Sequence, residues 1–346
     1  MNKVQVLVVD DSAFMRKMIS DILNKDFRIE VIGTARDGLD CLHKLTTLTP
    51  DVITMDIEMP KLDGLQTLRN IMEKRPLPVV MVSSLTSQSA ESTFQALHLG
   101  AVDFIEKPSG SISLDMEKVS RPIIRKVIAA SGAKVTAFPW KEPPACYKPL
   151  RSRIEQPMIV AIGTSTGGPR ALQKVLTDLP ADFPLPIVIV QHMPRGFTRS
   201  LAARLNKLSL ITVKEAEDQE ELTGGTAYIA PGDFHMNIVS KGNKLYVELD
   251  QSDAVNGHRP AVNRMLSSLA ALKQVRTIAV IMTGMGADGM EGLLQLKDAC
   301  PQTYAIAEAQ ESCIVFGMPK SIIKTGLADQ VLPLEQLSKE IIQTIS

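Results

Sequence analysis

The chain has 346 residues, of which 38 are lysine or arginine and 38 are aspartate or glutamate. This length is sufficient for two domains of ordinary size, each with a full core. Because the charges balance, no bulk attraction to nucleic acid or to an anionic membrane is expected, which disfavours a transcription factor.

The sequence also indicates where the protein works. None of its four cysteines belongs to a C-x-x-C pair or to a metal-ligand pattern with histidine, so we interpret them as reduced structural thiols. The apolar residues 4–9 end at Asp10 and Asp11, which is unlike a signal peptide. No apolar run approaches the length that crosses a bilayer. We therefore expect a cytoplasmic protein without membrane insertion.

Apolar runs alternate with amphipathic segments over the first part of the chain. The apolar runs predict five buried strands at residues 4–9, 30–35, 51–55, 78–82 and 102–105. The amphipathic segments predict five helices at residues 14–23, 39–48, 65–73, 90–99 and 114–130. Such alternation predicts a doubly wound α/β domain, in which helices cover both faces of a parallel sheet.

Charged residues and one serine follow the predicted strands of this domain. Asp10 and Asp11 follow the first strand, Asp56 the third, Ser83 the fourth and Lys107 the fifth. Functional residues of such sheets gather beyond the carboxyl ends of the strands. Three carboxylates would repel one another there without a cation, and oxygen ligands of this kind suit Mg²⁺. Aspartates are also common in turns, but the agreement of four strand ends favours a functional site.

Four segments carry a resemblance to a known family. They are Val-Val-Asp-Asp-Ser at 8–12, Met-Asp-Ile-Glu-Met-Pro at 55–60, Val-Ser-Ser at 82–84 and Phe-Ile-Glu-Lys-Pro at 104–108. Together they resemble the receiver domain of two-component response regulators, over about residues 3–125. Two positions vary from the commonest pattern: serine replaces the frequent threonine at 83, and phenylalanine stands at 104 where tyrosine is also common.

The resemblance implies a role for each of these residues. Asp56 would be the phosphoacceptor, and Mg²⁺ would be held by Asp10, Asp11, Asp56 and the backbone carbonyl of Glu58. Ser83 and Lys107 would contact the phosphoryl group, and Phe104 would be the aromatic switch residue. Phosphorylation adds charge and acceptor oxygens, so drawing in Ser83 and Lys107 is a physical route to a population shift.

A proline-rich segment separates the two halves of the chain. Prolines at positions 139, 143, 144, 149 and 157 disfavour both helix and sheet. We therefore expect a linker at residues 131–156 between domains at residues 1–130 and 157–346. Trp140 lies in this linker, and we expect it to cover an apolar patch of a neighbouring domain, with a partner contact as the alternative.

The second half begins with a strand that ends in a glycine-rich turn. Residues 159–162 predict a buried strand, and the pattern Gly163-x-Ser165-x-Gly167 follows it, with Pro169 at the expected helix start. A serine on a sharp strand-to-helix bend, near unpaired N–H groups, suits a nucleophile with an oxyanion site. The alternatives are a helix cap made by Ser165 or Thr166 and a phosphate-binding loop.

Further strands are predicted at residues 186–191, 277–283 and 303–307. If these strands are parallel, Ser165, His192 and Asp288 project from one edge of the sheet as nucleophile, base and orienting carboxylate. As alternatives, His192 is a polar strand-end residue and Asp288 caps the helix that begins near residue 289. His235 and His258 lie in turn-rich segments and are competing candidates for the base.

The order serine, histidine, aspartate differs from that of the α/β-hydrolases, which disfavours an ordinary lipase or esterase. Five segments instead resemble the catalytic domain of the bacterial chemotaxis protein-glutamate methylesterases. They are Gly-Thr-Ser-Thr-Gly-Gly-Pro at 163–169, Val-Gln-His-Met-Pro at 190–194, Ala-Pro-Gly at 230–232, Gly-His-Arg-Pro at 257–260 and Thr-Gly-Met-Gly-Ala-Asp-Gly at 283–289. The resemblance spans residues 158–346 and implies a Rossmann-like hydrolase domain.

This resemblance implies that Ser165 is the nucleophile, His192 the base and Asp288 the orienting acid. The amide of Thr166, which follows the nucleophile, is the first expected oxyanion donor, and that of Met285 is a second candidate. The substrate would be a γ-glutamyl methyl ester on a methyl-accepting chemotaxis receptor, hydrolysed without a cofactor, and particular glutamines would be deamidated. A chemotaxis histidine kinase would supply the phosphoryl group, and the receiver would cover the catalytic edge until it is phosphorylated.

Two other functions are compatible with the residues. In one, the turn at residues 163–168 binds a phosphate or nucleotide without catalysis. In the other, the receiver controls an adaptor that docks to receptors.

Overall fold

The computed structural model describes residues 3–84, 87–107, 116–133, 135 and 157–345, with only the backbone described at 87–89 and 116–119. The chain divides into two compact units, Met1–Trp140 and Lys141–Ser346. Pro108, the first two residues of the helix expected at 114–130, and residues 136–156 with Trp140 lie outside the described residues.

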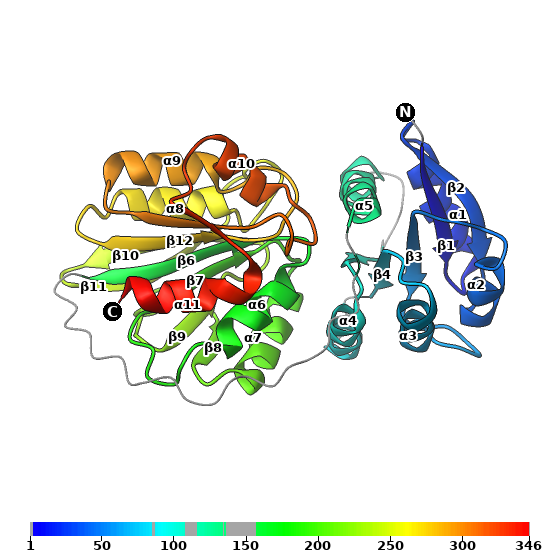
Figure 1. The fold of residues 1–346 in the computed structure, drawn as a ribbon, viewed down its shortest axis with the longest axis horizontal. Coiled ribbons are helices and arrows are strands. Elements are labelled where there is room, and N and C mark those ends of the chain that lie inside the picture. The colour runs from blue at the N-terminus through cyan, green and yellow to red at the C-terminus, as the bar shows by residue number, and fades with distance from the viewer. Residues whose placement is uncertain (1–2, 85–86, 108–115, 134, 136–156, 346) are drawn as a thin grey trace. The chain divides into compact units, whose positions relative to one another are not determined.

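The first unit contains a five-stranded parallel sheet of order β2-β1-β3-β4-β5 in its described part (Figure 1). Its strands are β1 (Val4–Val9), β2 (Ile29–Ala35), β3 (Val52–Asp56), β4 (Val79–Ser83) and β5 (Asp103–Glu106). Its helices are α1 (Ala13–Asn24), α2 (Gly38–Lys44), α3 (Gly64–Lys74), α4 (Ser87–Leu99) and α5 (Met116–Ser131). Helix α1 packs against α5, whereas α2, α3 and α4 pack in succession, so helices cover both faces as predicted.

The five strands predicted here are confirmed to within one residue at each end. The second helix is shorter than predicted, because it ends at Lys44 rather than at residue 48. The hydroxyls of Thr46 and Thr47 donate hydrogen bonds to the carbonyl oxygens of His43 and Lys44, respectively. Threonine side chains that satisfy backbone groups in this way compete with the helical hydrogen-bond pattern.

Short polar side chains start three of these helices at the edge of the sheet. Ser12 caps α1 by accepting the amide of Met15, and Asp37 and Asp63 cap α2 and α3 in the same manner. An N-cap oxygen satisfies an amide that the first helical turn leaves without a partner. The caps therefore fix the turns that follow β1, β2 and β3.

The described part of the second unit contains a seven-stranded parallel sheet of order β14-β13-β12-β6-β7-β9-β8 and a separate antiparallel hairpin, β10-β11. Its strands are β6 (Met158–Thr164), β7 (Ile187–Gln191), β8 (Thr212–Glu215), β9 (Thr226–Ile229), β10 (His235–Lys241), β11 (Lys244–Asp250), β12 (Arg276–Ile281), β13 (Tyr304–Glu308) and β14 (Gln330–Leu332). Its helices are α6 (Gly168–Thr177), α7 (Phe197–Leu208), α8 (Val262–Ala270), α9 (Met290–Ala299), α10 (Met318–Lys324) and α11 (Leu334–Thr344).

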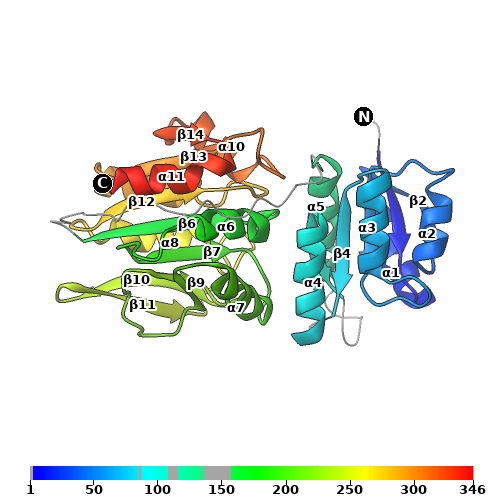
Figure 2. The same ribbon diagram turned by 60° about the horizontal axis from the view of Figure 1, so that its bottom comes forward.

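The parallel α/β architecture predicted for this unit is confirmed, and its four predicted strands are present to within two residues at each end. Helices α6, α7 and α11 cover one face of the sheet, and α8 and α9 the other (Figures 1 and 2). Strand β6 is buried along its whole length. Pro169 is the second residue of α6 rather than the first, because Gly168 begins the helix.

Five strands of this unit were not predicted. Strands β8 and β14 are short and carry polar or exposed residues, so they lack the apolar run that indicates a strand. Strands β10 and β11 are joined at Gly242 and Asn243, a dipeptide that is a recognised hairpin turn signal. The hairpin was missed because only alternating strands and helices were expected in this unit. No helix in the described part of the chain is both long and apolar enough to cross a membrane.

Gly64 allows α3 to pack against the end of β3. A Cβ atom there would lie 2.1 Å from the carbonyl oxygen of Asp56. We expect Gly64→Ala to destabilise the first unit by about 1–3 kcal/mol, because backbone must move to relieve the overlap. The matched control is Gly132→Ala, whose Cβ would be 3.9 Å from its nearest neighbour and should change stability by less than about 0.5 kcal/mol.

Chemical unfolding of both full-length variants measures this difference. Equal stability of the two variants would contradict the packing argument.

Candidate functional site

The first unit gathers three carboxylates at the carboxyl edge of its sheet. Carboxylate oxygens of Asp10, Asp11 and Asp56 all lie within 4.8 Å of one another. Asp10 and Asp56 are 0% and 1% exposed, whereas Asp11 is exposed. The Oδ2 atom of Asp10 is buried and has no hydrogen-bond partner in the described part of the chain. This oxygen-rich set, with one ligand atom unsatisfied, fits a Mg²⁺ ion.

A lysine balances part of this negative charge. Lys107 Nζ lies 2.7 Å from Asp56 Oδ2. Burial first, and then the charge of Asp56, raise the pKa of Asp10 to about 6. Burial raises the pKa of Asp56 despite its contact with Lys107. Burial would lower the pKa of Lys107, but its hydrogen bond to Asp56 and the surrounding carboxylates raise it above its ordinary value.

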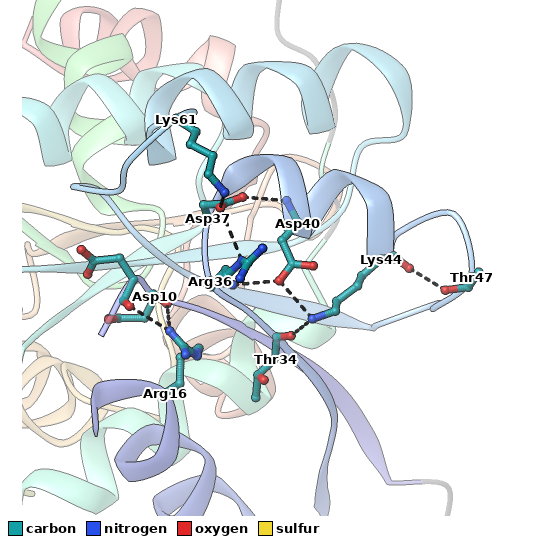
Figure 3. Close-up of polar contacts among 10 residues, drawn as sticks. Asp10, Arg16, Thr34, Arg36, Asp37, Asp40, Lys44, Thr47 and Lys61 are labelled. Atoms are coloured by element: carbon teal, nitrogen blue, oxygen red, sulfur yellow. Dashed lines mark hydrogen bonds and ion pairs between the residues drawn. The ribbon is translucent and has the colours of Figure 1, made fainter. Parts of the chain in front are cut away.

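Two further contacts hold the loops of this edge. Arg16 donates to the carbonyl oxygens of Asp10 and Asp11 at 2.7 and 2.9 Å (Figure 3). Lys61, in the β3–α3 loop, donates to the buried carboxylate of Asp37 at 2.7 Å and so ties this loop to the start of α2 (Figure 3). Neither basic residue was predicted, because nothing in the local sequence indicates its partner.

The other receiver candidates lie around the same strands. The amide of Glu58, which is exposed, donates to Asp56 Oδ1 at 3.4 Å. Ser83 ends β4, and its buried hydroxyl accepts a hydrogen bond at 2.8 Å from Thr93 of α4, a partner that the sequence did not indicate. Phe104 is buried in β5, with Lys126 Nζ 4.8 Å from its ring centre.

In the second unit, three parallel strands bring their ends together. Thr164 of β6 pairs with Gln191 of β7, so the next residue of each strand, Ser165 or His192, lies at the same edge. The amide of His192 donates to the Thr164 carbonyl at 3.2 Å. On the other side, the amide of Ser165 donates to the carbonyl of Thr283 at 3.0 Å, just past β12.

His192 and Asp288 form a buried pair. His192 Nε2 lies 2.7 Å from Asp288 Oδ2, and the two side chains are 6% and 2% exposed. Burial alone would raise the pKa of Asp288. The hydrogen bond and charge of His192, together with the amides of Asn263 and Val262, hold it below its ordinary value.

Asp288 also caps a helix, but this helix is α8 and not α9, the helix that begins near residue 289. Its two carboxylate oxygens accept the amides of Val262 and Asn263 at 2.7 and 2.9 Å, at the start of α8. The side chain of Asn263 in turn accepts the amides of Gly289 and Gly292 at the start of α9. The alternative prediction that Asp288 caps α9 is therefore wrong. The N-terminus of α8 favours a negative charge on Asp288.

The second ring nitrogen of His192 is unpaired in the described residues. His192 Nδ1 is buried and has no hydrogen-bond partner in the described part of the chain. No direct hydrogen bond joins it to Ser165 in the described residues, and such bonds often form only with substrate bound. The ring of His258 stacks on that of His192, with centres 3.9 Å apart and planes 4° from parallel. This stack restricts the rotation of His192.

The competing histidine His235 has a different environment. It is 0% exposed at the start of β10, and its Nε2 lies 3.2 Å from the carbonyl oxygen of Asp253. Burial lowers the pKa of His235. These contacts are those of a structural residue in the hairpin.

The expected oxyanion donors are the amide of Thr166, which follows Ser165 in the chain, and that of Met285, in the loop after β12. Thr166 is buried, and its carbonyl accepts the hydroxyl of Thr283 at 2.9 Å. The amide of Met285 has no hydrogen-bond acceptor in the described residues. A Cβ atom on Gly284 would lie 2.9 Å from that of Ser165, so glycine permits this loop to approach the turn closely.

Four polar residues at strand ends were missed, although each ends a buried strand or follows one within two residues and could have been found by that position. They are Thr164, Gln191, Thr283 and Glu308. Gln191 Nε2 donates to the carbonyl oxygen of Ser165 at 2.9 Å. Thr164 donates its hydroxyl to the carbonyl of Thr283 at 2.8 Å. These residues join the three strand ends beneath the candidate site.

The two units together define a class of protein, a response regulator in which a receiver domain is followed by a parallel-sheet α/β catalytic domain. Residues 6–118 match the response regulator receiver domain family, and residues 160–341 match the family described as CheB methylesterase. The chain belongs to the CheB methylesterase family and is an enzyme that carries a receiver domain.

Individual relatives are similar over the whole chain. Proteins named protein-glutamate methylesterase/protein-glutamine glutaminase from Geobacillus kaustophilus (strain HTA426) and Bacillus subtilis (strain 168) are 54% and 49% identical to it. They cover 100% and 98% of this chain and 99% and 97% of their own lengths. The crystal structure of the Thermotoga maritima CheB methylesterase catalytic domain is 50% identical, with a TM-score of 0.52, over 55% of this chain and 99% of its own.

The reciprocal caps of α8 and α9 can be tested. Asn263→Ala removes the acceptor of two buried amides, so we expect a loss of about 1–3 kcal/mol in stability. The matched control is Ser267→Ala, which removes an exposed hydrogen bond to Gln295 between the same two helices. It should cost less than about 0.5 kcal/mol.

Calorimetric unfolding of the full-length variants compares them. A control as destabilising as Asn263→Ala would contradict the capping role.

Proposed function

We propose that this chain is a phosphorylation-activated serine hydrolase that demethylates γ-glutamyl methyl esters on chemotaxis receptors and deamidates particular glutamines. Its action would adapt the sensory response of those receptors. The observation that carries the proposal is the buried 2.7 Å pair of His192 Nε2 and Asp288 Oδ2, beside Ser165 on the neighbouring strand end. The names of the relatives support the substrate class.

Ser165 is the proposed nucleophile. Its hydroxyl oxygen attacks the ester carbonyl carbon while His192 Nδ1 takes the hydroxyl proton. Nδ1 is assigned this task because Nε2 faces Asp288, which holds the tautomer and stabilises the imidazolium that forms. The stacked ring of His258 supports the same orientation.

The amides of Thr166 and Met285 are the proposed donors to the oxygen that becomes negative in the tetrahedral intermediate. As this intermediate collapses, the imidazolium of His192 returns its proton to the departing methoxide, and methanol leaves. Water, deprotonated by His192, then attacks the acyl group on Ser165 and releases a glutamate side chain. With a glutamine substrate, ammonia leaves in place of methanol, through the same intermediate. Neither reaction requires a cofactor.

Asp56 is the proposed phosphoacceptor of the receiver. Mg²⁺ would be held by Asp10, Asp11, Asp56 and the carbonyl of Glu58, where it would neutralise charge on the phosphoryl group as it is transferred. The unsatisfied Oδ2 atom of Asp10 supports this ligand set.

The new phosphoryl oxygens would attract Lys107 and the hydroxyl of Ser83. Ser83 would then exchange its hydrogen bond with Thr93 for one to the phosphoryl group. This movement, with Phe104 following, would carry the signal from β4 and β5 to α4.

The partners follow from the proposed chemistry. A chemotaxis histidine kinase would donate the phosphoryl group, and methyl-accepting receptors would be the substrates. We propose a cytoplasmic location, in keeping with the absence of a membrane-spanning helix in the described residues.

Replacing the nucleophile tests the hydrolase mechanism. Ser165→Ala should lower methanol release from methylated receptor by about 10⁴-fold or more, because the covalent route is lost. Phosphorylation of Asp56 by a small-molecule phosphodonor serves as the control and should be unchanged. Methanol release at the wild-type rate would reject Ser165 as the nucleophile.

Replacing the phosphoacceptor tests the regulation. Asp56→Asn should retain basal methanol release but lose its stimulation by a phosphodonor, because no acyl phosphate can form. The matched control is Asp21→Asn, an exposed carboxylate paired with Lys17 on α1, which should respond like the wild type. Stimulation that persists in the Asp56→Asn variant would contradict the assignment.

A further inference from the structure

The proposed mechanism leaves one deeply buried carboxyl group unused. Glu308 is the last residue of β13 and is 0% exposed. Its Oε2 accepts the amide of Thr283 at 2.7 Å, and its Oε1 lies 3.0 Å from the hydroxyl oxygen of Ser312. Glu308 forms no ion pair with any basic side chain of the described residues. A carboxylate in such a place would be an uncompensated charge.

Thr283, which Glu308 holds, contacts the serine turn through both its backbone and its side chain. Its carbonyl oxygen accepts the amide of Ser165 at 3.0 Å and the hydroxyl of Thr164 at 2.8 Å. Its own hydroxyl donates to the carbonyl oxygen of Thr166 at 2.9 Å. A displacement of Thr283 would therefore move the proposed nucleophile, and with it the loop that leads to Met285.

The surroundings of Glu308 favour its protonated form. Burial is the main cause that raises the pKa of Glu308 to about 7, and the charge of Glu335 on α11 adds to it. The hydrogen bonds of Thr283, Ser312 and Cys313 lower this pKa but do not offset the burial. Glu335 also interacts electrostatically with Arg170 on α6. The following loop carries Cys313 and the acidic Glu311. Burial and the charge of Glu308 raise the pKa of the Cys313 thiol.

A neutral acid is compatible with the hydrogen bonds that the Glu308 carboxyl group makes to Thr283 and Ser312. The hydroxyl of Ser312 accepts the amide of Leu334 at 3.0 Å and can donate to the carbonyl oxygen of Ala309 at 3.2 Å. Ser312 can therefore accept a proton donated by Glu308 Oε1, while Oε2 accepts the amide of Thr283. A glutamine would reproduce this pattern, because its NH₂ group can donate where the protonated oxygen does.

We propose that Glu308, as a neutral acid, is a positioning residue that holds Thr283, and through it the Ser165–Thr166 turn, in the geometry for ester hydrolysis. This inference rests on the proposed function, in which Ser165 is the nucleophile. Glu308 touches no reacting atom and acts only through Thr283.

Kinetics of the full-length variants with methylated receptor test the positioning role. Glu308→Gln should keep kcat within about threefold of wild type at about pH 6, where a glutamate with a pKa of about 7 is mostly protonated. Glu308→Ala leaves the buried amide of Thr283 without an acceptor and should lower kcat roughly 10- to 100-fold, with KM within about twofold, because the reacting groups are misplaced. Glu308→Asp, one methylene shorter and more readily ionised, should fall between them and serves if the alanine variant does not fold.

Three kinetic outcomes would overturn the proposal. Wild-type kcat in both Glu308→Ala and Glu308→Asp would exclude positioning. A loss in Glu308→Gln equal to that in Glu308→Asp would mean that an ionised carboxylate is needed. An effect confined to KM would assign Glu308 to substrate binding.

The pH dependence of stability tests the protonation state without an activity assay. A glutamate whose folded pKa lies above its ordinary value binds more protons folded than unfolded, so its contribution to stability is lost as pH rises. The loss should develop between about pH 4.5 and 7 and amount to roughly 300-fold in the folding equilibrium constant. Glu308→Gln should abolish it, whereas the exposed Glu311→Gln should not.

Parallel pH profiles for the wild type and Glu308→Gln would show that Glu308 is ionised in the fold and would overturn the proposal. Ser165→Ala is assayed beside these variants. If that variant still releases methanol, the proposed function fails, whereas the pH profile continues to decide the state of Glu308.

Discussion

The parallel pairing of β12, β6 and β7 is the constraint on which the catalytic half depends. Because the three strands run the same way and are in fixed register, Ser165, His192 and the loop at residues 283–288 emerge at one edge. Backbone hydrogen bonds from Ser165 to Thr283 and from His192 to Thr164 continue the pairing past the strands. The site is thus built on rigid elements rather than on free loops, which suits a geometry that tolerates little displacement.

Beneath this edge lies a layer of buried polar groups that hydrogen-bond to one another, although Gln191 Oε1 and Asn263 Nδ2 have no partner in the described residues. Asp288 serves both the imidazole of His192 and the start of α8, while Asn263 serves the start of α9. Glu308 and Thr283 play the equivalent part beside the serine turn. Buried polar groups are costly when unpaired, so each connection also makes an alternative arrangement of the site unfavourable. The same hydrogen bonds therefore serve both the stability of the fold and the geometry of the proposed catalytic site.

The receiver edge differs from the catalytic edge because it places three carboxylates, Asp10, Asp11 and Asp56, close together. Burial and mutual repulsion raise the pKa values of Asp10 and Asp56, and Lys107 offsets only part of the charge. Arg16 and the pair of Lys61 with Asp37 hold the surrounding backbone in place (Figure 3). A cation bound at this edge would relieve the excess of negative charge, and it would also offset the further negative charge of the proposed phosphoryl group.

The sequence by itself determined the two parallel α/β units, since apolar runs and helical spacing are local signals that need no tertiary information. It also placed Asp10, Asp56 and Lys107, and likewise Ser165, His192 and Asp288, at strand ends, because strand direction follows from the alternation of strands and helices. Only the tertiary structure decided which groups pair: that Asp288 caps α8 and not α9, that His258 stacks on His192, and that Glu308 holds Thr283. These contacts join residues far apart in the chain, and their partners are selected by distance and burial, which no local pattern records.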